Sequence, residues 1–145
     1  MADLRFKEMK RGYVKVSDGT QIVMRTAVVD AIPIGSSPFE VDFNVTYVVG
    51  ISVHASNEAK EEVKDRPLAP PSPVTDGWKT IRIAEKDVTF EEVEYLGDGG
   101  EKYIIRVEVE PLMVSKNTAY RAVDGSPLYI VRWAPKISWY RGDNA

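Results

Sequence analysis

The chain has no cysteine, one histidine (His54) and one glutamine among its 145 residues. Without cysteine it forms no disulfide and has no thiolate nucleophile, and one histidine does not make a zinc site of the usual His and Cys ligands. A histidine-dependent triad would have to use His54, which ends an alternating segment with no orienting carboxylate in sight. We therefore expect no catalytic residue, no metal and no cofactor, and we interpret His54 as an exposed or capping residue.

Long apolar runs are also missing. No stretch reaches the roughly 18 apolar residues of a membrane helix, and the first eight residues lack the apolar segment of a signal peptide. The net charge of −3 argues against attraction of the whole protein to nucleic acid or an anionic membrane. We therefore expect a cytoplasmic protein. The scarcity of amides and thiols beside abundant Glu, Lys and Arg follows the compositional trend of thermophile proteins.

Helical periodicity is nearly absent, and only the first ten residues and segment 57–65 have the features of short helices. Most of the chain instead alternates between apolar and polar residues, with turn signals between the alternating segments. A chain of 145 residues is long enough to bury a core as one domain. We predict a single all-β domain over 1–145, an antiparallel barrel or sandwich of seven or eight strands.

The strongest alternation runs from Phe39 to His54. Its odd positions are apolar or aromatic throughout: Phe39, Val41, Phe43, Val45, Tyr47, Val49, Ile51 and Val53. Strands rarely hold one phase for so long, so the pattern predicts a long strand with its odd residues buried as a set. Its even positions turn from polar to apolar at Val48, which predicts that the outer face is covered from there. Gly50 is the expected bend point.

Turn residues predict two hairpins. Segments 12–16 and 20–24 flank Ser17-Asp18-Gly19, and Val14, Val16, Ile22 and Met24 then share one face. Segments 88–96 and 101–110 flank Gly97-Asp98-Gly99-Gly100. The apolar phase slips inside 88–96, and an extra residue at Glu91–Glu92 would restore it as a β-bulge. Pro111 is expected to interrupt the second hairpin, and further strands are predicted at 78–83, 112–114 and 128–133.

The segment 56–77 is predicted to be a long surface loop or lid. Ser56 can cap a short helix at its start, and the proline-rich run 67–73 holds the chain extended. Loops of this length are uncommon and often functional. A second irregular segment, an aromatic and basic tail, is predicted at 134–145.

Acidic residues concentrate in 85–110, which has a net charge of −6. The carboxylates at issue are Glu91, Glu92, Glu94, Asp98, Glu108 and Glu110. Two of them close together in a cleft would permit hydrolase or hard-cation chemistry. Charged residues on an exposed hairpin also prevent strand-to-strand aggregation, and this is the interpretation we favour.

The segment 116–141 carries a net charge of +4, with aromatic residues interleaved among its cations. Such a mixture binds single-stranded nucleic acid when the rings are exposed, serves a protein interface, or simply fills the core. The candidate partner-binding residues are Arg121, Tyr129, Arg132, Trp133, Lys136, Trp139 and Tyr140.

These features favour a non-enzymatic β module that acts through protein–protein contacts, as a small macromolecule-binding or assembly subunit. A protein partner or self-association is the favoured binding mode, because an acidic hairpin and a basic segment are complementary. One alternative is an OB-like protein that binds single-stranded DNA or RNA through 116–141. A carboxylate-dependent hydrolase is the second alternative.

Overall fold

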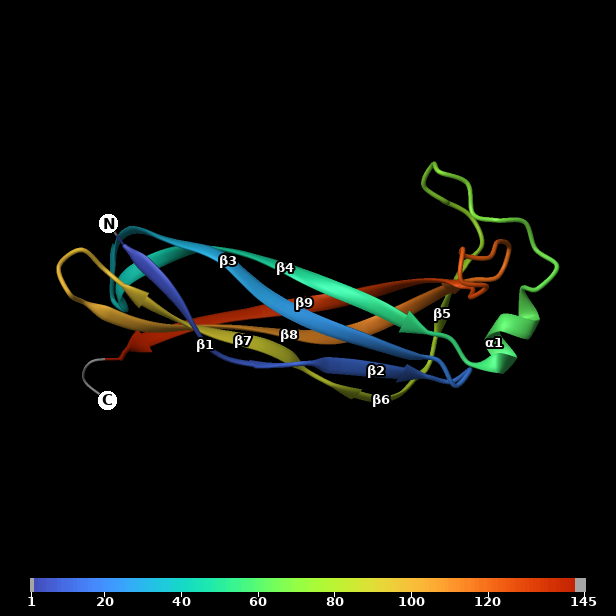
Figure 1. The fold of residues 1–145 in the computed structure, drawn as a ribbon, viewed down its shortest axis with the longest axis horizontal. Helices are drawn as coiled ribbons and strands as arrows, with labels where there is room; N and C mark the ends of the chain where they lie inside the picture. Colours follow the sequence, from blue (N-terminus) through green and yellow to red (C-terminus); the bar gives the residue numbers. More distant parts are fainter. Residues whose placement is uncertain (1, 143–145) are drawn as a thin grey trace.

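The computed structural model describes residues 2–142. These residues form nine strands and one short helix, arranged as two antiparallel sheets that do not close into a barrel (Figure 1). The all-β prediction is therefore confirmed in its sandwich form. The elements are β1 (Asp3–Lys10), β2 (Gly12–Val16), β3 (Gln21–Ser37), β4 (Glu40–His54), α1 (Asn57–Glu62), β5 (Trp78–Ile81), β6 (Ile83–Asp87), β7 (Thr89–Leu96), β8 (Lys102–Asn117) and β9 (Leu128–Arg141).

One sheet has the order β1-β7-β8-β5, with β9 along the other side of β8, and the second has the order β4-β3-β2-β6. The hairpins β3–β4 and β8–β9 run nearly the whole length of the molecule, and α1 lies at one end (Figure 1). The helix expected in the first ten residues is wrong, because this segment is β1, paired with β7. A short helix without tertiary contacts is only marginally stable in water, whereas β1 is held by its ladder with β7.

The two sheets are joined along one side, where the chain passes directly from β1 to β2 and from β6 to β7. The passages touch at Gly12, where an added Cβ would lie 2.6 Å from the carbonyl carbon of Val88. Thr89 donates a hydrogen bond to the Lys10 carbonyl (2.8 Å), and Lys10 forms an ion pair with Asp87 (2.6 Å). On the opposite side β4 and β9 end their sheets.

The first predicted hairpin is confirmed. Gly19 takes a φ of +87°, and its N–H donates to the Val16 carbonyl. The apolar face is buried as expected and forms the core between the sheets: Val14, Val16, Ile22 and Met24.

The second hairpin is confirmed as β7–β8, but the bulge predicted at Glu91–Glu92 is wrong. The ladder between β7 and β8 is unbroken from Thr89 to Leu96. Glu91 is buried, and its carboxylate accepts a hydrogen bond from the Val28 N–H of β3 (2.9 Å). Phe90 lies under the Arg106 guanidinium, 3.8 Å from its ring centroid. The apolar alternation of β7 is therefore broken at two positions without a bulge. Glu91 is buried because it binds the backbone of β3, and Phe90 lies on the outer face because the Arg106 guanidinium covers its ring.

The alternation of β4 is confirmed, and Phe43 is buried, but its odd residues are not buried as a set. Ile51 is 46% exposed and Phe39, just before the strand, is 73% exposed. The predicted cover over the outer face is also wrong, since Val48 is 55% exposed. Both results follow from the place of β4 at the edge of its sheet. Gly50 pairs in register with Arg25, without a break in the ladder.

Pro111 does not end β8, which runs on to Asn117. A register shift lies between Pro111 and Met113 in the ladder with β9, and on the other side β8 changes partner from β7 to β5. The segment predicted as one strand over 78–83 is split into β5 and β6, which belong to different sheets. Residues 134–141, expected to be a tail, continue β9, and residues 143–145 lie outside the described residues.

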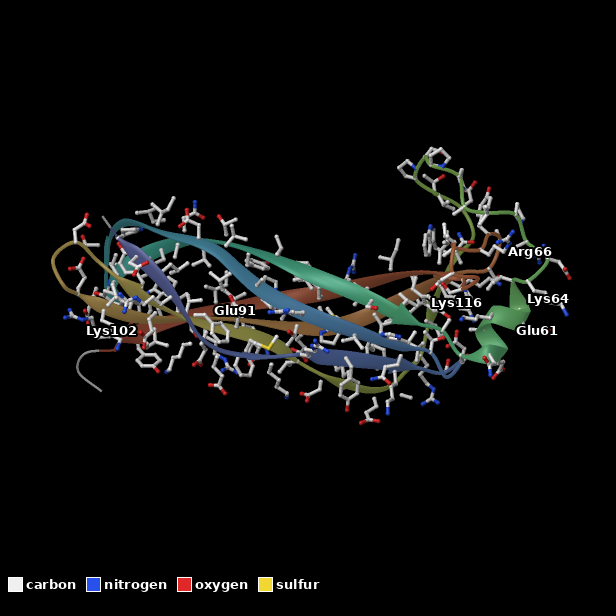
Figure 2. All side chains as sticks on the ribbon, viewed as in Figure 1. Glu61, Lys64, Arg66, Glu91, Lys102 and Lys116 are labelled. Atoms are coloured by element: carbon white, nitrogen blue, oxygen red, sulfur yellow. The ribbon has the colours of Figure 1, made fainter. Side chains whose placement is uncertain are left out.

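Segment 56–77 begins as predicted. The Ser56 hydroxyl accepts from the Ala59 N–H and donates to the Asp18 carbonyl, so the cap of α1 is tied to the first hairpin turn. The following loop contacts the segment before β9 through a bridge between Leu68 and Arg121. Figure 2 shows Lys116 beside this end and Glu91 between the sheets.

Candidate functional site

The free edges of the sandwich lie side by side along β4 and β9. Among the described residues β4 pairs only with β3, and β9 only with β8. The two strands run in opposite directions along the same side of the molecule (Figure 1). The free side of an edge strand presents a row of N–H and C=O groups that can bind a further strand. This side, which we call the open edge, is the candidate site.

Apolar and aromatic side chains fill the space between β4 and β9. Trp139 packs edge-on against Phe43, with ring centroids 5.4 Å apart, and Trp133 packs against Tyr47 at 6.0 Å. Both tryptophans therefore point between the sheets. This orientation agrees with the interpretation that the aromatic residues of 116–141 fill the core. Their inward orientation leaves no exposed tryptophan platform for stacking nucleic-acid bases.

Two further candidates are structural as well. The Tyr129 hydroxyl donates to Asp18 (2.5 Å) and shares a hydrogen bond with Thr20. Burial and the hydrogen bond to Asp18 raise the pKa of Tyr129 far above its usual value. The Arg121 side chain donates to the Arg66 carbonyl and so holds the loop near α1. These contacts hold both side chains against the end of the molecule near α1.

The remaining candidates lie on the solvent face of β9. Arg132, Lys136 and Tyr140 alternate with the inward tryptophans and are exposed, so the structure brings them onto one strand face. Lys136 also forms an ion pair with Glu110 at 3.1 Å. The solvent face of β4 carries Glu40 and Asp42 near the same end, where Arg141 reaches Glu40 at 3.2 Å.

A set of exposed apolar residues near the β3–β4 turn was missed by sequence reasoning. It comprises Val29, Ile32, Ile34 and Phe39. Phe39 lines a hollow of about 260 Å³ with Ile137, Ser138 and Trp139, at the end of the open edge. The indole N–H of Trp139 is buried there without a hydrogen-bond partner. Apolar residues in alternation predict a core, so the sequence carries no signal that these are exposed.

The acidic residues of the β7–β8 hairpin are engaged by neighbouring cations. Arg106 binds both Glu92 and Glu108 at 2.9 Å, and Lys102 lies 3.3 Å from Glu94. These ion pairs lie within the β7–β8 hairpin of one sheet and are typical of the charged solvent face of a hairpin. The geometry therefore gives the hydrolase alternative no specific support.

His54 ends β4 on its exposed face, 3.3 Å from the Ser52 hydroxyl. With Arg11, Arg25 and Ser52 it lines a shallow hollow of about 410 Å³. No cluster of three or more His, Cys, Asp or Glu residues with metal-binding geometry occurs within residues 2–142.

Comparison with protein-family models, with curated proteins and with solved structures yields no match to this chain. Within the part of the chain that the structure describes, no helix has the length and apolar character required to cross a membrane.

Proposed function

We propose that this protein is a non-catalytic β module that acts through protein–protein contacts, and that the open edge is its docking surface. The observation that carries the proposal is the pair of long, adjacent edge strands β4 and β9, each of which has no strand partner along its outer side among the described residues. Natural sandwiches usually block such edges with short strands, prolines or inward charges, and of the first two features the open edge has one proline, Pro135 of β9. Here the edges span 15 and 14 residues and enclose half-buried aromatic rings.

The partner that fits the edge best is a second copy of this chain. A twofold axis along the strands places β4 of one copy antiparallel to β9 of the other, and pairs the remaining two edges in the same way. Both sheets then continue across the interface, and the assembly closes without further free edges at this side.

Charge selects this arrangement over pairing of like edges. The solvent face of β4 carries Glu40 and Asp42, whereas that of β9 carries Arg132 and Lys136. Pairing β9 with a second β9 would set cations against each other, which is unfavourable for directly opposed residues. The twofold axis keeps each residue at its level along the strands, so pairing β4 with β9 sets Asp42 opposite Tyr140 and Thr46 opposite Lys136 of the other copy, with no like charges opposed.

Sedimentation velocity with charge variants tests the proposal. Thr46→Lys sets a second cation opposite Lys136 of the other copy and should weaken the dimer at least about tenfold, which corresponds to about 1.4 kcal/mol. Adding Lys136→Glu should recover most of the loss, because opposite charges then face each other across the interface. Lys79→Glu on β5 has the same change of charge as Lys136→Glu, away from the open edge, and is the matched control.

Three outcomes would overturn the proposal: a monomer at all accessible concentrations, equal effects of the control and the edge variants, or no recovery in the double variant. Thermal unfolding of each variant separates lost association from lost folding. Tight, salt-dependent binding of a single-stranded oligonucleotide would favour the nucleic-acid alternative instead.

A further inference from the structure

We infer that the outer face of the β2–β3–β4 sheet carries a binding site for a small phosphate-bearing ligand. The site is the shallow hollow lined by Arg11, Val23, Met24, Arg25, Gly50, Ile51, Ser52 and His54. It is separate from the strand edge of the proposed function, since its polar groups rise from the sheet face.

Two guanidinium groups define the site. The β2–β3 ladder pairs Gly12 with Met24, and the next position along it sets Arg11 beside Arg25. Within residues 2–142 neither side chain has an ion pair or a hydrogen bond, although cations elsewhere on the sheets contact carboxylates. Like charges at neighbouring cross-strand positions are destabilising without a counter-ion. An anion between them removes that repulsion.

Strand β4, which lies beside β3, leaves space for a ligand next to Arg25. Gly50 pairs with Arg25 on β4, and a Cβ there would meet only the Arg25 carbonyl oxygen, at 4.0 Å. The backbone at Gly50 is not in the left-handed region, so glycine is not required by conformation. Its absent side chain leaves the space beside Arg25 open to a ligand.

The remaining lining fits an oxyanion with a small organic body. The Ser52 hydroxyl and the His54 ring, 3.3 Å apart, offer hydrogen-bond donors beside the guanidinium groups. No carboxylate lines the hollow, so its potential is positive although the whole chain has a net charge of −3. Paired guanidinium groups match the geometry of phosphate oxygens. The Val23 side chain, opposite Ser52 on the outer face, provides an apolar surface for the organic part of a phosphate monoester.

The test is an NMR titration of the labelled protein with inorganic phosphate and with phenyl phosphate, at constant ionic strength. Phosphate should shift the amide signals around Arg25 and Ser52 in a saturable way. Tighter binding of phenyl phosphate assigns the ligand as a monoester, and equal binding assigns it as free phosphate; the site is supported in both cases. Sodium chloride at the same ionic strength should leave these signals in place.

Variants make the test specific. Arg25→Gln should weaken binding at least tenfold, and Gly50→Leu should abolish it by filling the hollow without altering charge. Arg82→Gln, an exposed arginine away from the hollow, should leave the affinity unchanged. Thermal unfolding confirms that each variant is folded. Equal losses in all three variants, unsaturated shifts, or binding that survives Gly50→Leu would overturn the site.

Discussion

The ammonium group of Lys116 lies 2.8 Å from the Asp18 carboxylate, and their side chains are only 11% and 10% exposed. Lys116 also contacts Glu62 of α1, at 2.7 Å. This ion pair therefore connects the first hairpin turn, strand β8 and the helix at one end of the molecule. The charges are removed from water, so the loss of one partner leaves the other poorly solvated.

Replacement of Lys116 by methionine should lower the free energy of unfolding by about 1.5–3 kcal/mol, the range for hydrogen bonds to charged groups. Chemical denaturation measures the loss. Lys79→Met removes an exposed lysine of β5 and should change stability by less than about 0.5 kcal/mol. Equal losses in the two variants would contradict a special role for the buried pair.

Stability should fall in acid in part because of Asp18. Burial alone would raise the pKa of this carboxyl, but hydrogen bonds from Lys116, Tyr129 and Thr20 outweigh burial and lower it. A lowered pKa in the folded state contributes stability above the unfolded pKa of about 3.9, and this contribution is lost as pH falls through the folded value. Asp18→Asn should flatten the acid limb of a stability–pH curve. Asp65→Asn, an exposed carboxyl in the loop after α1, should leave it unchanged.

Phe43 and Phe39 offer a matched pair for testing the core. Phe43 contacts the rings of Tyr95, Tyr103 and Trp139, whereas Phe39 is largely exposed. Phe43→Ala should cost about 3–5 kcal/mol through loss of burial and cavity formation. Phe39→Ala should lower stability by less than about 0.5 kcal/mol. Comparable losses in urea denaturation would contradict the observed difference in burial.

The buried Glu91 carboxylate should be replaceable only by another acceptor. Its Oε1 accepts the Val28 N–H beside a register shift in β3, where the ladder leaves that group available. Glu91→Ala should cost about 1–3 kcal/mol, because a buried donor loses its partner. Glu91→Gln retains an amide oxygen and should be milder. Faster hydrogen exchange of the Val28 amide in Glu91→Ala alone would identify the cause.

Gly12 and Gly50 should respond oppositely to alanine. An alanine at 12 would place its Cβ against the backbone of Val88, Asp87 and Thr89, none of which yields easily. We expect Gly12→Ala to lower the free energy of unfolding by about 3 kcal/mol or more, at the upper end of the usual cost of overpacking. Gly50→Ala meets no close atom and should leave stability unchanged or raise it slightly. Thermal unfolding distinguishes the two outcomes, and equal behaviour would contradict the close sheet crossing at Gly12.

Local patterns predicted the parts of the fold that are fixed by neighbouring residues. The turn at Gly19, the buried face of Val14 and Ile22 and the cap at Ser56 each depend on chemistry within a few residues. The alternation of β4 likewise revealed which side of the strand faces inward. It did not reveal that β4 ends its sheet, because a strand's neighbours are decided by chain segments far away.

The same limit applies to the candidate site. The basic aromatic segment was recognised, but not that Trp133 and Trp139 face inward while Arg132 and Lys136 face solvent on one continuous strand. Glu91 was counted among surface carboxylates because acidic residues rarely enter a core. Only the position of β3, more than sixty residues away in sequence, explains its burial.

The joined side of the sandwich also has a consequence for the order of folding. The hairpins β3–β4 and β8–β9 connect segments that are close in sequence, whereas the Lys10–Asp87 contact closes a loop of 77 residues. Contacts between distant segments form slowly, because the chain loses the entropy of loop closure before the new contacts stabilise it. We therefore expect the two long hairpins to appear first and the passage at Gly12 to dock last. Variants at Gly12 should mainly accelerate unfolding, and variants in the hairpins should slow refolding.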